Sequence, residues 1–196
     1  MAKLYFRYGA MNSGKSTLLM QVAYNYEENH RDVIVLKSEI DTKGDNTLIS
    51  RIGISRKVDI LLKKEEKILQ YKEIIQKKHA ILVDEVQFLS AEQVEELWYI
   101  AHVFDIPVLG YGLKSDFRTN SFEGSKRMFE LADEITELVT ICKCGKTARF
   151  NARKVNEKFT LEGEQNVIDG SENIEYIPMC ADCYIREVMN KTQASF

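Results

Sequence analysis

The sequence predicts an α/β fold with a parallel sheet, followed by a small module that carries all four cysteines. Short apolar runs alternate with segments of helical periodicity, and a glycine-rich loop follows the first run. After Ile141 the sequence consists of short polar segments that contain glycine. Strands that alternate with helices favour parallel pairing through right-handed crossovers. A chain of 196 residues can bury one core and a small satellite module. We therefore expect a domain boundary at Ile141.

The first part of the chain gives two buried strands, a helix between them and a charged helix further on. Lys3–Tyr8 is a short apolar-aromatic run, and apolar side chains recur at helical spacing over Leu18–Tyr26. Val33–Leu36 is continuously apolar, as expected of a strand buried on both faces. Residues 41–57 are polar and irregular, so we expect a mobile loop there, and Glu65–Lys78 is expected to form a charged helix.

The next part of the chain continues the alternation. Ser90 followed by Gln93 has the pattern of a capping box, in which each side chain bonds the other residue's backbone N–H. The expected elements here are strands at Ala80–Val83, Pro107–Tyr111 and Ile135–Ile141, and helices from Ser90 to about Phe104 and over Ser125–Ala132.

The glycine-rich loop after the first strand fits the G-x-x-x-x-G-K-[ST] pattern in full. Its glycines let backbone N–H groups converge on phosphate oxygens, and the following helix presents its positive dipole end. Lys15 is expected to reach the β- and γ-phosphates of ATP, and the Ser16 hydroxyl to bind Mg²⁺. The alternative is a glycine-rich turn with a surface lysine. The residues of this loop are Gly9, Ala10, Met11, Asn12, Ser13, Gly14, Lys15 and Ser16.

An acidic pair closes the buried strand at Ala80–Val83. Asp84 is placed to hold the Mg²⁺, as an acid at the end of a buried strand does in such enzymes. Glu85, next along the chain, could accept the proton of an attacking hydroxyl. In isolation an Asp-Glu pair is best explained as a solvated strand end, and the phosphate loop favours the functional interpretation.

The four cysteines form two close pairs separated by a long loop. Cys142 and Cys144 flank one residue, and Cys180 and Cys183 flank two. Four thiolates suit tetrahedral Zn²⁺ in a closed structural site, whereas the alternative is a set of free buried thiols. A site with four sulfur ligands has no open position for substrate, so the metal is expected to fasten the loop between the pairs.

Composition and charge exclude several classes of protein. The net charge of −3 and the lack of a dense Lys/Arg block argue against nucleic-acid binding. No apolar stretch approaches the ~20 residues that span a bilayer, and the N-terminus shows no signal peptide. We therefore expect a cytoplasmic protein with reduced thiols and no membrane partner.

Further motifs are spread along nearly the whole chain. They are Gly9–Thr17 with Met11 inside it, Asp84-Glu85-Val86-Gln87-Phe88, Gly110-Tyr111-Gly112-Leu113 with Phe117, Phe150-Asn151-Ala152-Arg153, Gly163-Glu164-Gln165, Val167-Ile168-Asp169-Gly170, and Tyr176 before Cys180. With these motifs the chain resembles the type II thymidine kinases.

The resemblance implies a RecA-like P-loop core at 1–141, a zinc-binding lasso at 142–190 that closes over the nucleoside, and a tail at 191–196. It implies transfer of the γ-phosphate of ATP-Mg²⁺ to thymidine with Glu85 as catalytic base, a homotetramer, and feedback inhibition by dTTP. The ATP site would further include Thr17, Gln87 and Lys43, the last in place of the family's arginine. The nucleoside site would comprise Met11, Leu113, Phe117, Asn151, Asp169, Gly170 and Tyr176.

Two other functions are open at this point. The chain could be a P-loop kinase or ATPase that acts on a different nucleoside or small substrate. It could also be a non-enzymatic zinc-binding adaptor with a vestigial phosphate loop. The intact set of Lys15, Ser16, Asp84 and Glu85 argues against the adaptor.

Overall fold

The computed structural model describes residues 1–40, 46–50, 52–165 and 173–190. Lys43, Asp169, Gly170 and the expected tail at 191–196 lie outside the described residues.

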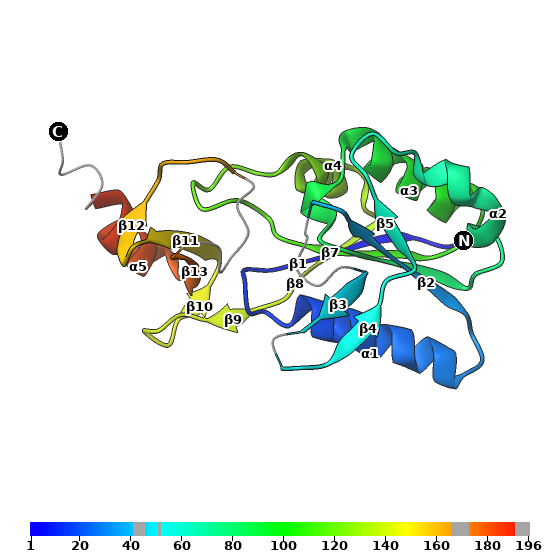
Figure 1. The fold of residues 1–196 in the computed structure, drawn as a ribbon, viewed down its shortest axis with the longest axis horizontal. Coiled ribbons are helices and arrows are strands. Elements are labelled where there is room, and N and C mark those ends of the chain that lie inside the picture. The colour runs from blue at the N-terminus through cyan, green and yellow to red at the C-terminus, as the bar shows by residue number, and fades with distance from the viewer. Residues whose placement is uncertain (41–45, 51, 166–172, 191–196) are drawn as a thin grey trace.

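A six-stranded sheet forms the centre of the larger part of the molecule (Figure 1). All five pairings between neighbouring strands are parallel. The predicted α/β fold with a parallel sheet is therefore confirmed. In spatial order the strands are β5 (Ile60–Leu62), β2 (Val33–Ser38), β6 (Ala80–Asp84), β7 (Val108–Gly112), β1 (Leu4–Tyr8) and β8 (Glu134–Glu137).

Helices cover both faces of this sheet, and each face has its own hydrophobic cluster. In Figure 1, α1 (Lys15–Glu28) lies below the sheet, whereas α3 (Ala91–Val103) and α4 (Glu123–Leu131) lie above it. Successive side chains of a strand point to opposite faces. Accordingly, Val33 and Val35 of β2 pack in the cluster with α1, and Ile34 and Leu36 pack in the cluster with α3.

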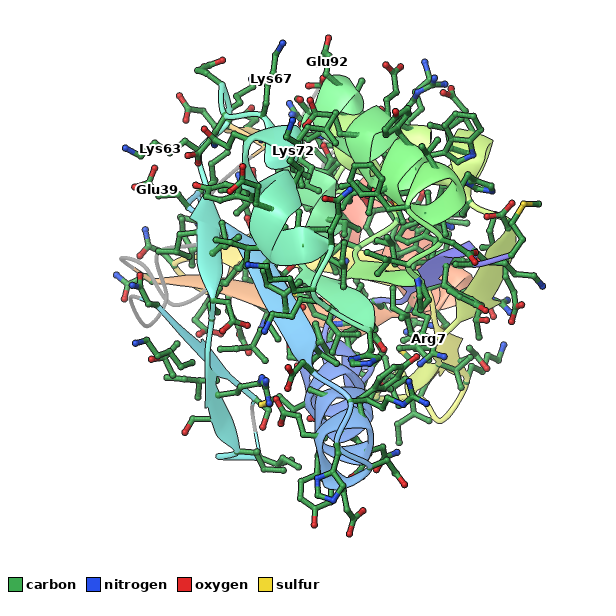
Figure 2. All side chains as sticks on the ribbon, turned by 90° about the vertical axis from the view of Figure 1, so that its right-hand side faces the viewer. Arg7, Glu39, Lys63, Lys67, Lys72 and Glu92 are labelled. Carbon is green, nitrogen blue, oxygen red and sulfur yellow. The ribbon has the colours of Figure 1, made fainter. Side chains whose placement is uncertain are left out.

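The capping box at the start of α3 is confirmed. Gln93 N–H donates to Ser90 Oγ at 3.2 Å, and Ser90 N–H donates to Gln93 Oε1 at 3.1 Å. Figure 2 shows Glu92 pointing away from the protein, while Gln93 is buried. The amide of Gln93 also donates to the carbonyls of Lys63 and Glu66, so this cap joins α3 to the preceding loop.

The expectation of an irregular loop over 41–57 is wrong for the part that the structure describes. Strands β3 (Thr47–Ile49) and β4 (Ser55–Lys57) pair as an antiparallel hairpin. Leu48 is buried in the cluster with α1, and Arg56 forms a bidentate ion pair with Glu27 of α1. These contacts hold a polar sequence in strand conformation.

The expected helix over Glu65–Lys78 is shorter than predicted, and β5 was not expected. A 3₁₀ turn at Ile68–Tyr71 leads into α2 (Lys72–Ile75). The Glu96 carboxylate of α3 accepts the backbone N–H groups of Ile68 at 2.5 Å and Leu69 at 3.2 Å, which fixes the start of the turn. Figure 2 labels Lys67, which precedes this turn, and Lys72, which follows it.

The expected strand over Ile135–Ile141 is divided in two. Its first half is β8 of the central sheet, and its second half is β9 (Thr140–Ile141), which pairs with β10 (Thr147–Ala148) in a separate hairpin. The chain leaves the central sheet after Leu138, whose N–H donates to the carbonyl of Tyr8.

A small C-terminal module lies at the end of the molecule opposite the N-terminus (Figure 1). It contains an antiparallel sheet of β12 (Lys158–Thr160), β11 (Phe150–Val155) and β13 (Ile174–Met179). The short helix α5 (Ala181–Tyr184) continues into a π-helical turn at Ile185–Met189. The module has a hydrophobic cluster of its own, formed by Cys142, Ala148, Ala152, Met179, Cys180, Cys183, Tyr184 and Val188. Among the described residues, none of the helices is both long and apolar enough to cross a bilayer.

Candidate active site and metal centre

The phosphate loop connects β1 to α1, as the sequence predicted. Gly14 has φ of 78° and ψ of 17°, a left-handed conformation that glycine adopts without steric penalty, and its carbonyl accepts the Leu18 N–H of the first helical turn. A Cβ atom on Gly9 would lie 2.3 Å from the Leu138 carbonyl oxygen and 2.5 Å from Ser13 Oγ. Only glycine fits where the loop passes this close to the chain that enters the C-terminal module.

Lys15 folds back over the loop from the first residue of α1. Its Nζ donates to the carbonyls of Gly9 at 3.2 Å and Ala10 at 2.9 Å, and it lies 3.4 Å from Ser13 Oγ. The side chain is buried. Its ammonium group is thus held at the mouth of the loop, where phosphate oxygens would bind.

Ser16 and Asp84 come together from two different elements. Ser16 Oγ lies 3.2 Å from Asp84 Oδ2 and 3.5 Å from Asp84 Oδ1. Octahedral Mg²⁺ with ligands at 2.0–2.1 Å places neighbouring oxygens roughly 3 Å apart. The hydroxyl and the carboxylate therefore fit as two neighbouring positions around one magnesium ion.

Asp84 is buried at the end of β6, and its neighbours shift the pKa of its carboxyl group. Burial, followed by the adjacent charge of Glu85, raises the pKa of Asp84 to about 8. The positive charges of Lys37 and Lys15 and the Ser16 hydroxyl act in the opposite direction. A divalent cation would favour the ionised carboxylate strongly, so this site suits a metal ion.

The side chain of Gln87 binds both Glu85 and the backbone at Leu113, just after the end of β7. Glu85 has φ of 52° and is half-buried, and its carboxylate accepts a hydrogen bond from Gln87 Nε2. Gln87 Oε1 in turn accepts the Leu113 N–H at 3.0 Å. A Cβ on Gly112 would lie 2.6 Å from Gln87 Oε1, so this glycine permits the close packing. The predicted residues Glu85, Gln87 and Leu113 therefore form one connected group.

Strand β11 presents two different faces, which the alternation of its side chains explains. Ala152 points into the hydrophobic cluster of the module. Asn151 and Arg153, two residues apart, contact the core at the phosphate loop and at the Phe117 ring, respectively. Asn151 Oδ1 accepts the Met11 N–H of the phosphate loop at 2.8 Å. The structure thus brings Met11 and Asn151 together.

The two expected aromatic walls of the nucleoside site meet around a third residue. Phe117 and Tyr176 are both buried, and the guanidinium of Arg153 lies 3.7 Å from the Phe117 ring centroid and 5.3 Å from that of Tyr176. The motif containing Arg153 was recognised in the sequence, but no role was predicted for this arginine. The signal was its spacing of two from Asn151.

The four cysteines converge within the module. Their sulfur atoms all lie within 4.8 Å of one another, and Cys144 Sγ is 3.5 Å from Cys180 Sγ. Tetrahedral Zn²⁺ with Zn–S bonds of about 2.3 Å would place its sulfur ligands roughly 3.8 Å apart. The four residues therefore fit a closed zinc site.

Positive side chains surround this cluster. Lys146 is paired with Asp182, Lys143 lies 2.8 Å from the Glu187 carboxylate, and Arg186 Nη2 lies 3.5 Å from Cys183 Sγ. Four thiolates with one Zn²⁺ carry a net charge of −2, and Arg186 is the cation that contacts one of these sulfur atoms, whereas Lys143 and Lys146 are paired with acids.

Comparison with known proteins identifies the family. A family model described as "Thymidine kinase" matches residues 2–184. The chain belongs to the thymidine kinase family. A protein named thymidine kinase from Streptococcus agalactiae serotype Ia is 42% identical over 187 residues, which cover 94% of this chain and 97% of that protein. One from Streptococcus gordonii is 41% identical over 193 residues, which cover 97% of this chain and all of that protein.

The likeness to one solved structure is much weaker than the likeness to these relatives. A replication initiator DnaA bound to AMPPCP and single-stranded DNA matches 70% of this chain and 40% of that chain, with a TM-score of 0.44 and 18% sequence identity. This likeness is too low to carry an inference about the present member of the thymidine kinase family.

Removal of the Asn151 side chain tests the link between the phosphate loop and the module. Asn151→Ala is expected to raise the KM for ATP and for thymidine by about 5-fold each, since the loss of one buried hydrogen bond of ~1 kcal/mol frees the Met11 N–H. Steady-state kinetics measure both constants. Asn151→Asp retains an acceptor oxygen and should keep the ATP KM low. A rise in the thymidine KM alone would show that Asn151 acts on the nucleoside and not through the loop.

The metal centre gives a second prediction. Purified protein should contain about one Zn²⁺ per chain, as a single four-thiolate site requires, and Cys180→Ser should raise the thymidine KM more than the ATP KM. Elemental analysis and kinetics are the measurements. Native protein without zinc, in which all four thiols react with a thiol reagent, would contradict this assignment.

Proposed function

We propose that this chain is a thymidine kinase that transfers the γ-phosphate of ATP, with Mg²⁺, to the 5′-hydroxyl of thymidine to give dTMP and ADP. The observation that carries the proposal is the match to the thymidine kinase family over residues 2–184 of a chain whose phosphate loop and acidic pair are intact. Such a product would serve nucleotide salvage for DNA synthesis.

The proposed roles follow from charge and position. Residues Gly9–Thr17 bind the phosphates, Lys15 neutralises charge that develops on the γ-phosphoryl group, and Ser16 and Asp84 hold Mg²⁺. Bound Mg²⁺ supplies charge neutralisation of the phosphates. Glu85 accepts the proton of the 5′-hydroxyl, and its hydrogen bond from Gln87 supports this role because it orients the carboxylate.

We propose that Met11, Leu113, Phe117, Asn151 and Tyr176 surround the nucleoside. The burial of Phe117 and Tyr176 and their shared neighbour support this placement. Asp169 and Gly170 of the lasso, which lie outside the described residues, complete the proposed nucleoside site, and Lys43 the proposed phosphate site.

The division into a core at 1–141 and a lasso at 142–190 is also a proposal. The separate hydrophobic cluster and cysteine site of the C-terminal module support it. In this proposal the zinc ion is structural and fastens the lasso between its two cysteine pairs. We further propose a cytoplasmic homotetramer that is inhibited by dTTP.

Steady-state kinetics with thymidine, deoxyuridine and deoxycytidine test the proposed function. Thymidine should have the highest kcat/KM. Deoxyuridine differs by one methyl group and should be poorer by ~1–3 kcal/mol, or about 10- to 200-fold. Deoxycytidine should be the poorest of the three.

The alternative is a P-loop kinase or ATPase with another substrate. ATP consumption without phosphorylation of any of the three nucleosides would favour it and overturn the proposal. The family match favours the nucleoside kinase.

A further inference from the structure

Arg153 is a buried cation in the middle of β11, with 2% of its surface exposed. A charge removed from water destabilises a protein unless hydrogen bonds and nearby charge compensate it. The side chain is among the largest that are fully buried. Its surroundings must therefore be arranged around it.

The guanidinium binds oxygens of two different segments, β13 and the loop at Glu162–Glu164. Its Nε and Nη2 donate to the Tyr176 hydroxyl at 2.9 and 2.6 Å. Its Nη2 also donates to the Glu164 carbonyl at 2.6 Å, and Nη1 to the Glu162 carbonyl at 3.4 Å. These partners are a phenol and two backbone carbonyls, so the arginine holds chain segments in place and does not merely neutralise an acid.

Two aromatic rings complete the environment. The guanidinium carbon lies 3.7 Å from the centroid of the Phe117 ring, a stacking distance, and 5.3 Å from that of Tyr176. A planar cation over an aromatic face is attracted by the ring quadrupole, more strongly when both are away from water. The orientation of Phe117 relative to Tyr176 is therefore set through Arg153.

The loop at Glu162–Glu164 passes close to the guanidinium. Gly163 has φ of 103°, and a Cβ at this position would lie 2.9 Å from Arg153 Nη1. The backbone conformation and the short approach both favour glycine here. The loop is shaped to the arginine.

Further contacts attach the core loop that carries Asp116 and Phe117 to the module. Gln165 Nε2 donates to the buried Asp116 carboxylate at 3.1 Å, and the Tyr184 hydroxyl donates to the Phe117 carbonyl. Arg153 lies at the centre of this junction between the core and the module.

We propose that Arg153 is a positioning residue for the nucleoside site: its guanidinium fixes the Phe117 and Tyr176 rings and the loop at Glu162–Glu164 in the arrangement that binds thymidine. The inference rests on the proposed function, which makes these rings the walls of the nucleoside site. Lysine cannot replace this arrangement, because it has one compact donor group and no planar fork to stack and bind several oxygens at once.

Arg153→Lys is the principal test. The thymidine KM should rise by about 10-fold or more, since small displacements of positioning groups have large kinetic effects, while the ATP KM stays within about 2-fold. Zinc content should be unchanged. Arg127→Lys is the control, because Arg127 is an arginine of α4 that pairs with Glu95 and Glu130, and it should leave all constants unchanged.

Tyr176→Phe provides a second variant that keeps the aromatic ring and removes only the hydroxyl that Arg153 binds. It should raise the thymidine KM in the same direction, by a smaller factor. Wild-type thymidine KM in folded Arg153→Lys would overturn the inference. An equal rise in the KM for thymidine and the KM for ATP, accompanied by loss of zinc, would also overturn it. If Arg153→Lys does not fold, an unchanged thymidine KM in Tyr176→Phe would do so. Failure of the proposed function is distinct, because the wild-type protein itself would then not phosphorylate thymidine.

Discussion

Replacement of Lys15 by alanine is expected to lower kcat for phosphoryl transfer to thymidine by about 10³-fold or more. The transition state spreads negative charge over the γ-phosphoryl oxygens, and a cation fixed at the mouth of the phosphate loop lowers its energy. Nζ of Lys15 is fixed there by the carbonyls of Gly9 and Ala10. The measurement is kcat at saturating ATP and thymidine.

The fold should survive this change. Lys15 contributes its charge to the loop and is not among the hydrophobic residues of either core cluster. Loss of its hydrogen bonds leaves two carbonyls to be satisfied by water, so the free energy of unfolding should fall by no more than about 1–3 kcal/mol. Lys67→Ala removes an exposed lysine at another end of the molecule, seen in Figure 2, and should have wild-type activity. A folded Lys15→Ala protein with near-normal kcat would refute the assignment of the phosphate loop.

The parts of the fold that could be predicted from the sequence are those determined by residues close together along the chain. Continuous apolar runs such as Ala80–Val83 became central strands of the sheet, and the Ser90–Gln93 pattern became a capping box. The errors arose where distant residues decide. The turn at Ile68 begins where Glu96 accepts its backbone N–H, and the paired strands β3 and β4 pack through Leu48 against α1. Neither partner can be found from local periodicity.

The same distinction applies to the candidate site. The phosphate loop is contiguous, so its pattern alone placed Lys15 and Ser16, and the end of a buried strand placed Asp84 near them. The environment of Arg153 could not be predicted in this way, because Tyr176 is 23 residues away and Phe117 lies in the core, in the loop between β7 and α4. The pairing of β11 with β13 brings Arg153 opposite Tyr176, and the packing of the module on the core brings it to Phe117.

Glu85→Gln should lower kcat by ~10²- to 10⁴-fold, the usual contribution of a general base, with little change in the KM for thymidine. The amide has the shape of the carboxylate and can still accept the hydrogen bond from Gln87 Nε2, so the connection to Leu113 is kept. What it loses is the ability to take a proton from the attacking hydroxyl. Steady-state kinetics with thymidine and ATP measure both constants.

Two variants separate this role from the alternatives. Glu85→Asp keeps a carboxylate on a shorter side chain. It should retain more activity than Glu85→Gln, because a misplaced base can still accept a proton, whereas an amide cannot. Glu92→Gln removes an exposed carboxylate of α3 and should leave kcat unchanged. A lower kcat with constant KM marks an interaction made in the transition state. If Glu85→Gln instead raises the thymidine KM and keeps kcat, Glu85 orients the nucleoside and another group accepts the proton.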